Sequence, residues 1–488
     1  MKLGKLYEKA GLTSGGGGDL TVTGFAIDHR KVAPGTVFGA FEGSRVNGED
    51  FIPTAVNAGA AAVVARNEAN VTGAVHIASD EPRRTFAKLA AAYFSPVPKT
   101  IVAVTGTNGK TSTVEMTRQI WRMCGERAAS IGTLGVTTSD ESVSTGLTTP
   151  DIVTFLANMS GLAREGVTHV AYEASSHGLS QFRNEGLAVA AGAFTNFSRD
   201  HLDYHGTMEA YFEAKMRLFD EVLQPGASAV IWADGGDWTA KAKARAEGLD
   251  LRVFTVGPQG EHLRLEAREP TQLGQNLTIA FAGRSFEQRL PLIGAYQAAN
   301  ALVAAGLAIV TGTDAARVFD AIGRLQPVRG RLERAVITPV GAPVYVDYAH
   351  TPDALEAALA ALRPHTGGRL IVVFGAGGDR DEGKRQSMGS IAAKGADVVF
   401  VTDDNPRGED PAAIRAAILR GAPVAHEVAG RREAIAAAIA EAQSDDIVLV
   451  AGKGHEQGQI IGRGDNARVL PFDDVQVARE CAAGGDNL

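Results

Sequence analysis

Thr100-Ile-Val-Ala-Val-Thr-Gly-Thr-Asn-Gly-Lys-Thr-Ser112 is the stretch of sequence that decides the fold of this chain. Its first six residues are apolar or β-branched, which predicts a buried strand. A glycine-rich turn follows, and the residues from Thr111 to Cys124 have the pattern of a helix. Because a strand, a glycine turn and a helix form the first half of a βαβ unit, the sequence predicts a mainly parallel sheet covered by helices.

The turn itself has the composition of a phosphate-binding loop. Its glycines let backbone N–H groups approach a phosphate, Lys110 supplies positive charge, and Thr111 can ligate magnesium at the N-terminus of a helix. Val104 stands where a strict Walker A motif has its first glycine, and an ordinary glycine turn is the alternative interpretation. The position between an apolar strand and a helix favours nucleotide binding.

Outward from this loop, the pattern divides the chain into three α/β domains, since 488 residues are too many for one hydrophobic core. We predict a small N-terminal α/β domain over residues 1–97. A central P-loop ATPase-like domain with a mainly parallel sheet is predicted over 98–328. Strands and helices alternate again after Pro327-Val-Arg-Gly330, which predicts a doubly wound, Rossmann-like C-terminal domain over 329–488.

Composition excludes several classes of protein. The formal net charge of −8 gives no overall basic field for nucleic acid or an anionic membrane. Cys124 and Cys481 are far apart in sequence, which suits a reducing compartment and argues against a disulfide framework. The N-terminus lacks the apolar core of a secretory signal, and no apolar stretch is long enough for a membrane span. We therefore expect a cytoplasmic protein, and we expect it to be a monomer.

Two polar segments follow predicted strands of the central domain: Glu173-Ala-Ser-Ser-His-Gly178 and Arg199-Asp-His-Leu-Asp-Tyr-His-Gly206. Sheets of this kind place ligands at the carboxyl ends of their strands. Glu173 and His201 are candidate ligands for magnesium or for its bound water. A polar loop is the ordinary interpretation of either segment taken alone.

Lys215 is unusual because it shares an apolar helical stripe with Tyr211, Leu218 and Val222. A lysine in such a stripe is costly to bury unless it is paired. Snorkelling of the long side chain to water is the ordinary explanation. The functional alternative is a chemically altered lysine.

In the third domain, Phe374-Gly-Ala-Gly-Gly-Asp-Arg380 follows a predicted strand, but Arg380 occupies the third glycine position of a dinucleotide fingerprint. The oxidoreductase interpretation is therefore weak. Asp404-Asn-Pro-Arg407 follows the next strand, and its arginine can bind a carboxylate through two parallel hydrogen bonds. A plain polar turn is the alternative.

Taken in order, these motifs resemble those of the Mur ligases, and the resemblance covers essentially the whole chain. It is strongest to the members that add the third amino acid to the UDP-muramoyl peptide in peptidoglycan synthesis. The resemblance implies that Lys215 is the lysine that the family carbamylates, giving N6-carboxylysine. Carbamylation turns the cation into an anion and would resolve the problem of a positive charge near magnesium.

The resemblance implies two overlapping sets of residues for ATP and for catalysis. The ATP site is expected at Gly106, Thr107, Asn108, Gly109, Lys110, Thr111, Ser112, Asn300, Arg331 and Asp347. The catalytic residues are expected to be Lys110, Glu173, His201 and Lys215. The magnesium ligands are expected to be Thr111, Glu173, His201 and the carbamate of Lys215.

Two further sets are implied for the other substrates. The UDP-muramoyl dipeptide is expected to contact His29, Ser44, Arg45, Val46, Thr148, Thr149, Ser175, Gln181 and Arg183. The diamino acid is expected to contact Arg380, Asp404, Asn405, Pro406, Arg407, Gly452 and Glu456. The sequence departs from the family pattern at His29, where a serine is common, and at Gln297, which replaces a frequent asparagine.

The implied reaction is ATP-dependent amide formation. ATP would phosphorylate the γ-carboxylate of the D-glutamate in UDP-MurNAc-L-Ala-D-Glu, and the amino group of a diamino acid would attack the acyl phosphate. The motif Asp404–Arg407 favours meso-diaminopimelate, because L-lysine and L-ornithine lack the second carboxylate that Arg380 and Arg407 would bind. Both amino acids remain alternatives. The last domain is expected to close on ATP binding.

Two other activities remain open on the sequence. A folylpolyglutamate synthase would share the ATP loop and the carbamylated lysine, although the positions that resemble the dipeptide site disfavour it. A P-loop ATPase or kinase would hydrolyse ATP without an amino acid, or phosphorylate a hydroxyl.

Overall fold

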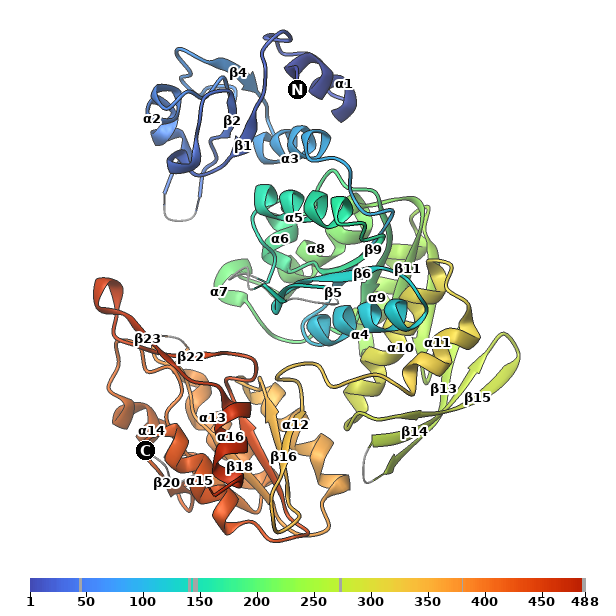
Figure 1. Ribbon diagram of the computed structural model, residues 1–488, viewed down its shortest axis with the longest axis vertical. Coiled ribbons are helices and arrows are strands. Elements are labelled where there is room, and N and C mark those ends of the chain that lie inside the picture. The colour runs from blue at the N-terminus through green and yellow to red at the C-terminus, as the bar shows by residue number, and fades with distance from the viewer. Residues whose placement is uncertain (44–45, 139–141, 144–147, 272–273, 380, 485–488) are drawn as a thin grey trace. The chain divides into compact units, whose positions relative to one another are not determined.

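The computed structural model describes residues 1–43, 46–138, 142–143, 148–271, 274–379 and 381–484 (Figure 1). The chain forms two compact units. The first contains Met1–Leu265, Ala280–Arg284 and Ala299–Ala321, and the second contains Glu266–Ile279, Ser285–Ala298 and Ile322–Leu488. The predicted three-domain α/β architecture with mainly parallel sheets is confirmed, since the described residues form one sheet of four, one of eleven and one of six strands within the three predicted ranges. The exact boundaries at 97 and 328 stay predictions.

The first unit begins with a small parallel sheet in the order β1-β2-β3-β4. Its strands are β1 (Gly24–Ala26), β2 (Thr36–Gly39), β3 (Ala62–Ala65) and β4 (Val75–Ala78). Its helices are α1 (Leu3–Ala10), α2 (Ile52–Asn57) and α3 (Pro82–Tyr93), with short 3-10 turns at His29–Lys31 and Gly48–Phe51. All residues of β2 and β3 are buried, as expected for central strands that are covered on both faces.

The predicted strand of the opening stretch is β5 (Thr100–Thr105), and it lies inside an eleven-stranded sheet whose strands from β5 to β12 belong to the first unit. It pairs in parallel with β9 on one side and with β10 on the other. Beyond these, β6 is parallel to β9, β11 to β10 and β12 to β11, while β7 and β8 form an antiparallel edge. The phosphate-loop candidate therefore leaves the sheet between two parallel neighbours.

The remaining strands of this sheet lie on both sides of β5. They are β6 (Ala128–Gly132), β7 (Gly135–Thr137), β8 (Ser142–Val143), β9 (His169–Glu173), β10 (Val189–Phe194), β11 (Leu223–Trp232), β12 (Arg252–Gly257), β13 (Leu263–Thr271), β14 (Gly274–Phe281) and β15 (Arg284–Leu290). Its helices are α4 (Lys110–Met123), α5 (Ile152–Arg164), α6 (Ser176–Ser180), α7 (Leu202–His205), α8 (Met208–Arg217) with a π-helical end at Leu218–Val222, α9 (Gly236–Glu247), α10 (Ala295–Val310) and α11 (Ala315–Ile322).

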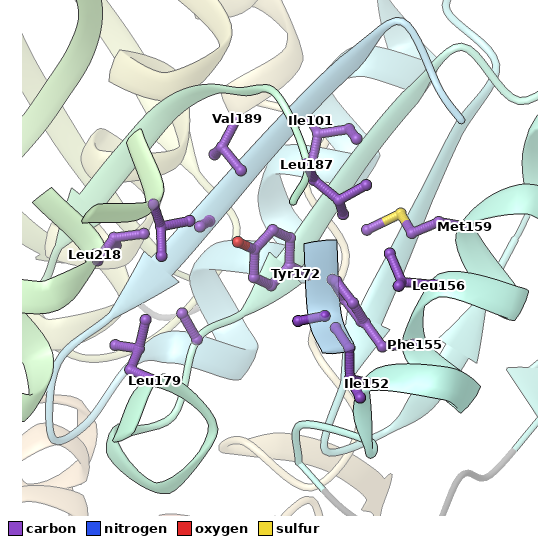
Figure 2. Packing of buried hydrophobic residues seen from close by; sticks show 14 of the residues in the cluster. Ile101, Ile152, Phe155, Leu156, Met159, Tyr172, Leu179, Leu187, Val189 and Leu218 are labelled. Atoms are coloured by element: carbon purple, nitrogen blue, oxygen red, sulfur yellow. The ribbon is translucent and has the colours of Figure 1, made fainter. Parts of the chain in front are cut away.

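The core of the first unit shows why these residues form a sheet covered by helices. Phe155, Leu156 and Met159 lie on one face of α5 and pack toward Tyr172 of β9 (Figure 2). The rings of Phe155 and Tyr172 meet edge to face with centroids 5.0 Å apart, an arrangement that adds to the burial energy. The packing fixes the carboxyl end of β9, which carries Glu173.

The second unit contains a six-stranded sheet in the order β16-β17-β21-β18-β19-β20, parallel except for the β16–β17 pair. Its strands are β16 (Glu333–Ile337), β17 (Pro343–Asp347), β18 (Leu370–Phe374), β19 (Val398–Val401), β20 (His426–Glu427) and β21 (Ile447–Ala451). Its other elements are the antiparallel ribbon β22 (Gly458–Ile461) and β23 (Arg468–Pro471), the helices α12 (Pro352–Leu362), α13 (Gly383–Gly395), α14 (Pro411–Leu419), α15 (Arg431–Glu441) and α16 (Asp474–Ala482), and 3-10 turns at Arg363–His365 and Gly464–Asn466.

This sheet is covered on both faces. Leu370, Val372 and Phe374 of β18 pack into a core with residues of α12, α13 and α14. The alternate residues Ile371 and Val373 pack into a second core with residues of α15 and α16. A strand buried on both faces reads as a continuous apolar run, and the doubly wound arrangement predicted from such runs is confirmed.

The most apolar run of the chain lies in α10, which is 16 residues long. A membrane span needs about 20 predominantly apolar residues. In the part of the chain that the structure describes, no helix is long and apolar enough to cross a membrane.

Candidate active site

The loop between β5 and α4 has a backbone that only glycine permits at two positions. Gly106 has a φ of 142° and Gly109 a φ of 83°. A Cβ at Gly106 would lie 2.0 Å from Thr195 Oγ1, and one at Gly109 would lie 2.3 Å from Asn300 Oδ1. The structure therefore brings Asn300, a predicted ATP contact on α10, directly against the predicted phosphate loop.

Residues after β10 hold this loop in shape. Asn196 accepts hydrogen bonds from the N–H of Thr107 at its backbone oxygen and from the N–H of Asn108 at its side chain, both at 2.9 Å. The hydroxyl of Thr195 donates to Asn108 O at 2.6 Å. Thr195 and Asn196 were not predicted as site residues, although they directly follow β10 and the carboxyl ends of such strands are where ligands bind.

Two lysine ammonium groups meet at one backbone oxygen of the loop. Lys110 Nζ donates to Gly106 O at 3.0 Å and to Thr107 O at 2.7 Å. Lys215 Nζ donates to the same Gly106 O at 2.7 Å, and Lys215 is only 1% exposed. Snorkelling, the ordinary explanation for this lysine, is therefore wrong.

Burial and the neighbouring Lys110 hold the pKa of Lys215 well below its usual range. Lys215 Nζ also lies 4.3 Å from the centroid of the Tyr211 ring. A depressed pKa favours the neutral amine, which is the nucleophilic form that reacts with carbon dioxide. The environment is suited to carbamylation, which stays a prediction.

Glu173 lies beside the loop, because the N–H of Ala174 donates to Val104 O at 2.9 Å. Its carboxylate accepts hydrogen bonds from Thr133 N at 2.7 Å and Thr133 Oγ1 at 3.2 Å, and the residue is 2% exposed. These hydrogen bonds from Thr133 fix the orientation of the Glu173 carboxylate, as is typical for a carboxylate that binds a metal ion.

His201 caps α7 in a left-handed conformation with a φ of 51°, and its side chain is 46% exposed. Its ring lies 4.9 Å from the ring of His177. Among the described residues, no group of three or more His, Cys, Asp or Glu side chains could hold a metal ion. Because Mg²⁺ in nucleotide sites takes one or two protein ligands together with phosphates and water, Glu173 and the buried Thr111 still fit such a site.

Five of the residues predicted for the dipeptide lie in one network next to Glu173: Thr148, Thr149, Ser175, Gln181 and Arg183. The hydroxyl of Thr149 donates to Glu173 O at 2.9 Å and lies 2.9 Å from Ser175 Oγ. Thr133 Oγ1 lies 3.2 Å from Thr148 Oγ1. The hydroxyl of Ser175 caps α6 by accepting from Gly178 N.

Arg183 and Gln181 extend this network. Arg183 donates to Thr149 O at 2.7 Å and to Gln181 Oε1 at 2.7 Å, and burial lowers its pKa. Both residues line a cavity of about 60 Å³ together with Arg83. Arg83, on α3, was missed because nothing in the sequence brings it near residue 183.

A larger cavity of about 460 Å³ is lined by the predicted residues His29 and Val46. The ring of His29 stacks on Phe51 with centroids 4.3 Å apart. Flat rings and a concave wall suit a planar heterocycle. Ser44 and Arg45 lie outside the described residues.

The predicted ATP contacts Arg331 and Asp347 belong to the second unit. The guanidinium carbon of Arg331 lies 4.6 Å from the centroid of the Tyr348 ring. Asp347 Oδ2 accepts a hydrogen bond from Leu332 N at 2.7 Å. Burial raises the pKa of Asp347 to about 6, against the lowering effect of Arg331.

The predicted amino-acid pocket gathers at the carboxyl ends of two strands, β19 and β21, that lie on either side of β18 in the sheet. Asp404-Asn405-Pro406-Arg407 follows β19, and Gly452 and Glu456 follow β21. Arg407 has a φ of 51° and donates to Gly378 O at 2.9 Å. Left-handed backbone at an arginine costs free energy and is typical of functional positions. Arg380 lies outside the described residues.

Gly452 and Asn405 show how closely these loops pack. Gly452 has a φ of 120°, and a Cβ there would lie 2.7 Å from Asp404 Oδ2. Asn405 Nδ2 donates to Glu456 Oε2 at 2.9 Å. Most of the residues predicted for the diamino acid are therefore brought together within one unit.

With this geometry in place, three family models match the chain. They are the Mur ligase family catalytic domain at residues 21–100, the Mur ligase middle domain at 104–308, and the Mur ligase glutamate ligase domain at 330–454. The chain belongs to the Mur ligase family.

Comparison with individual proteins gives a more specific result than the family models. The chain is 60% identical over 462 residues, 95% of each sequence, to UDP-N-acetylmuramoyl-L-alanyl-D-glutamate–2,6-diaminopimelate ligase of Zymomonas mobilis. It is 51% identical over 468 residues, again 95% of each, to the enzyme of the same name from Bradyrhizobium diazoefficiens. A solved structure of that name is similar with a TM-score of 0.74 and 32% identity, covering 100% of both chains.

Proposed function

We propose that this protein is the ATP-dependent ligase that joins meso-diaminopimelate to the D-glutamate γ-carboxylate of UDP-MurNAc-L-Ala-D-Glu during peptidoglycan synthesis. Relatives at 50–60% identity over nearly the whole chain carry a name with these substrates. The observation that carries the proposal is the turn Asp404–Arg407, in which Asn405 donates to Glu456 and Arg407 donates to Gly378 O.

This pocket suits the far end of diaminopimelate. That end carries an ammonium and a carboxylate, so it needs both an acceptor and a cation. Glu456 is the acceptor, and the planar guanidinium of Arg407 binds a carboxylate through two hydrogen bonds. A pocket that desolvates Arg407 without such a partner would lose free energy, which disfavours L-lysine and L-ornithine.

The first step transfers the γ-phosphoryl group of ATP to an oxygen of the glutamate γ-carboxylate, with ADP as the leaving group. Backbone N–H groups at the start of α4 and the Lys110 ammonium stabilise charge on the phosphates. Bound magnesium would neutralise phosphate charge, held by Thr111 and Glu173 with His201 and the Lys215 carbamate as the further predicted ligands. Thr149, Ser175 and Arg183 orient the dipeptide for this transfer.

In the second step the amino nitrogen of diaminopimelate attacks the acyl carbon, the C–O bond to phosphate breaks, and inorganic phosphate leaves as the amide forms. The attacking amine must be neutral, so it loses a proton before or during attack. Here the role of the pocket residues is to hold the diamino acid in the attacking orientation.

The test is phosphate release from ATP by the purified protein with UDP-MurNAc-L-Ala-D-Glu, adding meso-diaminopimelate, L-lysine or L-ornithine in separate reactions. Stimulation by diaminopimelate alone, with a product of the tripeptide mass, is the expected result. Stimulation by lysine or ornithine instead would keep the ligase and overturn the assignment of Arg407. Phosphate release that needs no amino acid would indicate a P-loop ATPase.

A further inference from the structure

Lys453 follows β21 in the second unit and has a fully buried ammonium group. Its residue exposure is 0%. Lys453 Nζ donates to Asn405 Oδ1 at 2.8 Å and to Glu456 Oε2 at 3.2 Å. A buried lysine is costly unless it is paired, and both partners of Lys453 are residues predicted for the amino-acid pocket.

Lys453, Asn405 and Glu456 form a closed triangle of hydrogen bonds. Asn405 Oδ1 accepts from Lys453 and from Ile460 N, the latter at 2.9 Å, while Asn405 Nδ2 donates to Glu456 Oε2 at 2.9 Å. Two donors on one side and a carboxylate on the other fix which way the amide faces. The triangle thus joins the loop after β19 to the loop after β21.

The triangle also orients the carboxylate of Glu456. In the part of the chain that the structure describes, the hydrogen bonds to this carboxylate, from Lys453 and from Asn405, both reach Oε2. Oε1 is left to accept a hydrogen bond from another molecule, and the Glu456 side chain is 31% exposed. An ammonium group of a bound amino acid is the partner that suits this oxygen.

We propose that Lys453 is a positioning residue of the amino-acid pocket, which rests on the proposed function. Its ammonium holds Oε2 of Glu456 and the amide of Asn405, and so presents Oε1 to the distal ammonium of the diamino acid. It also balances the charge of Glu456 before the amino acid binds.

The experiment compares Lys453→Met with the wild-type protein in steady-state phosphate release. ATP and UDP-MurNAc-L-Ala-D-Glu are held saturating while diaminopimelate is varied, and each of the other substrates is then varied in turn. The KM for diaminopimelate is expected to rise by roughly 10- to 100-fold, the loss typical of a charge-assisted hydrogen bond in a pocket. The KM values for ATP and the dipeptide are expected to stay unchanged.

The matched control is Lys394→Met, the same substitution at an exposed lysine of α13, which is expected to leave all three KM values unchanged. A double-mutant cycle with Glu456→Gln separates positioning from general stability. Lys453→Met is expected to have a much smaller effect in the Glu456→Gln background, because the two residues act through one contact. An equal effect in both backgrounds would overturn the proposal.

If Lys453→Met does not fold, Lys453→Gln keeps a donor for Asn405 while removing the charge, and the same rise in KM for diaminopimelate is expected. A KM unchanged in the folded variant would overturn the role of Lys453 alone. If the wild-type protein itself shows no stimulation by diaminopimelate, the proposed function fails instead.

Discussion

The phosphate loop of the first unit and the amino-acid pocket of the second unit handle positive charge in opposite ways. In the loop, Lys110 and Lys215 both donate to Gly106 O, and burial together with the charge of Lys110 lowers the pKa of Lys215. In the second unit, buried cations have carboxylate partners: Arg431 binds Asp474 at 2.7 Å with both side chains 0% exposed, and Lys453 lies 3.2 Å from Glu456.

The difference follows from the ligands proposed for the two regions. A triphosphate brings several negative charges that the Lys110 ammonium can bind, whereas the lowered pKa of Lys215 favours the neutral amine that the proposed carbamate needs. A diamino acid brings charges of both signs, so its pocket must be close to neutral before binding. Removing a cation should therefore lower the rate of phosphoryl transfer in the first region, and lower the selectivity for the amino acid in the second.

The largest effect is expected for Lys110→Met. Loss of this ammonium removes charge stabilisation from the transferred phosphoryl group, and we expect phosphate release to fall by roughly 1000-fold. Stopped-flow or steady-state assays measure the rate of phosphate release. Lys99→Met, at an exposed position, is the control. Near-normal turnover of Lys110→Met would show that the loop does not contact the transferred phosphate.

Lys215→Met is expected to reduce turnover by roughly 100-fold, because the proposed carbamate can no longer form. The same change is expected to raise thermal stability, since it removes an amine whose pKa burial depresses. The carbamate itself is tested by carbon-13 NMR of wild-type protein in labelled bicarbonate. Absence of a carbamate signal that depends on Lys215 would contradict the modification.

Arg407→Lys is expected to lower kcat/KM for diaminopimelate by roughly 10- to 100-fold, because a lysine cannot form the two parallel hydrogen bonds of a guanidinium. The ratio of kcat/KM for diaminopimelate to that for L-lysine should shrink by a similar factor. Arg420→Lys, at an exposed end of α14, is the control. An unchanged ratio would mean that selectivity resides elsewhere.

The smallest effect is expected for Asp347→Asn on stability. The pKa of Asp347 is raised from 3.8 to about 6, so its protonated form contributes stability that is lost as the pH rises through about 6. The asparagine variant should therefore gain about 1 kcal/mol relative to wild type between pH 5 and pH 7, measured by urea unfolding. A difference in unfolding free energy between the variant and the wild type that does not depend on pH would contradict the raised pKa of Asp347.

Sequence patterns that lie within a few residues were sufficient for much of this architecture. The apolar run Thr100–Thr105, the glycine turn and the following helix predicted β5, the loop and α4, because strand and helix periodicities are local. The apolar helical stripe placed Lys215 on the buried face of its helix. The family resemblance then supplied its proposed role. The order of the motifs was enough to recognise the family.

Contacts between segments far apart in the chain were decided only by the tertiary structure. Thr195 and Asn196 form hydrogen bonds with a loop some 88 positions earlier in the chain. Lys453 donates a hydrogen bond to Asn405, which lies 48 positions earlier. The approach of Arg83 to the cavity of Arg183 is of the same kind. No local periodicity encodes such pairs, because they exist only when the sheets have brought the ends of different strands together.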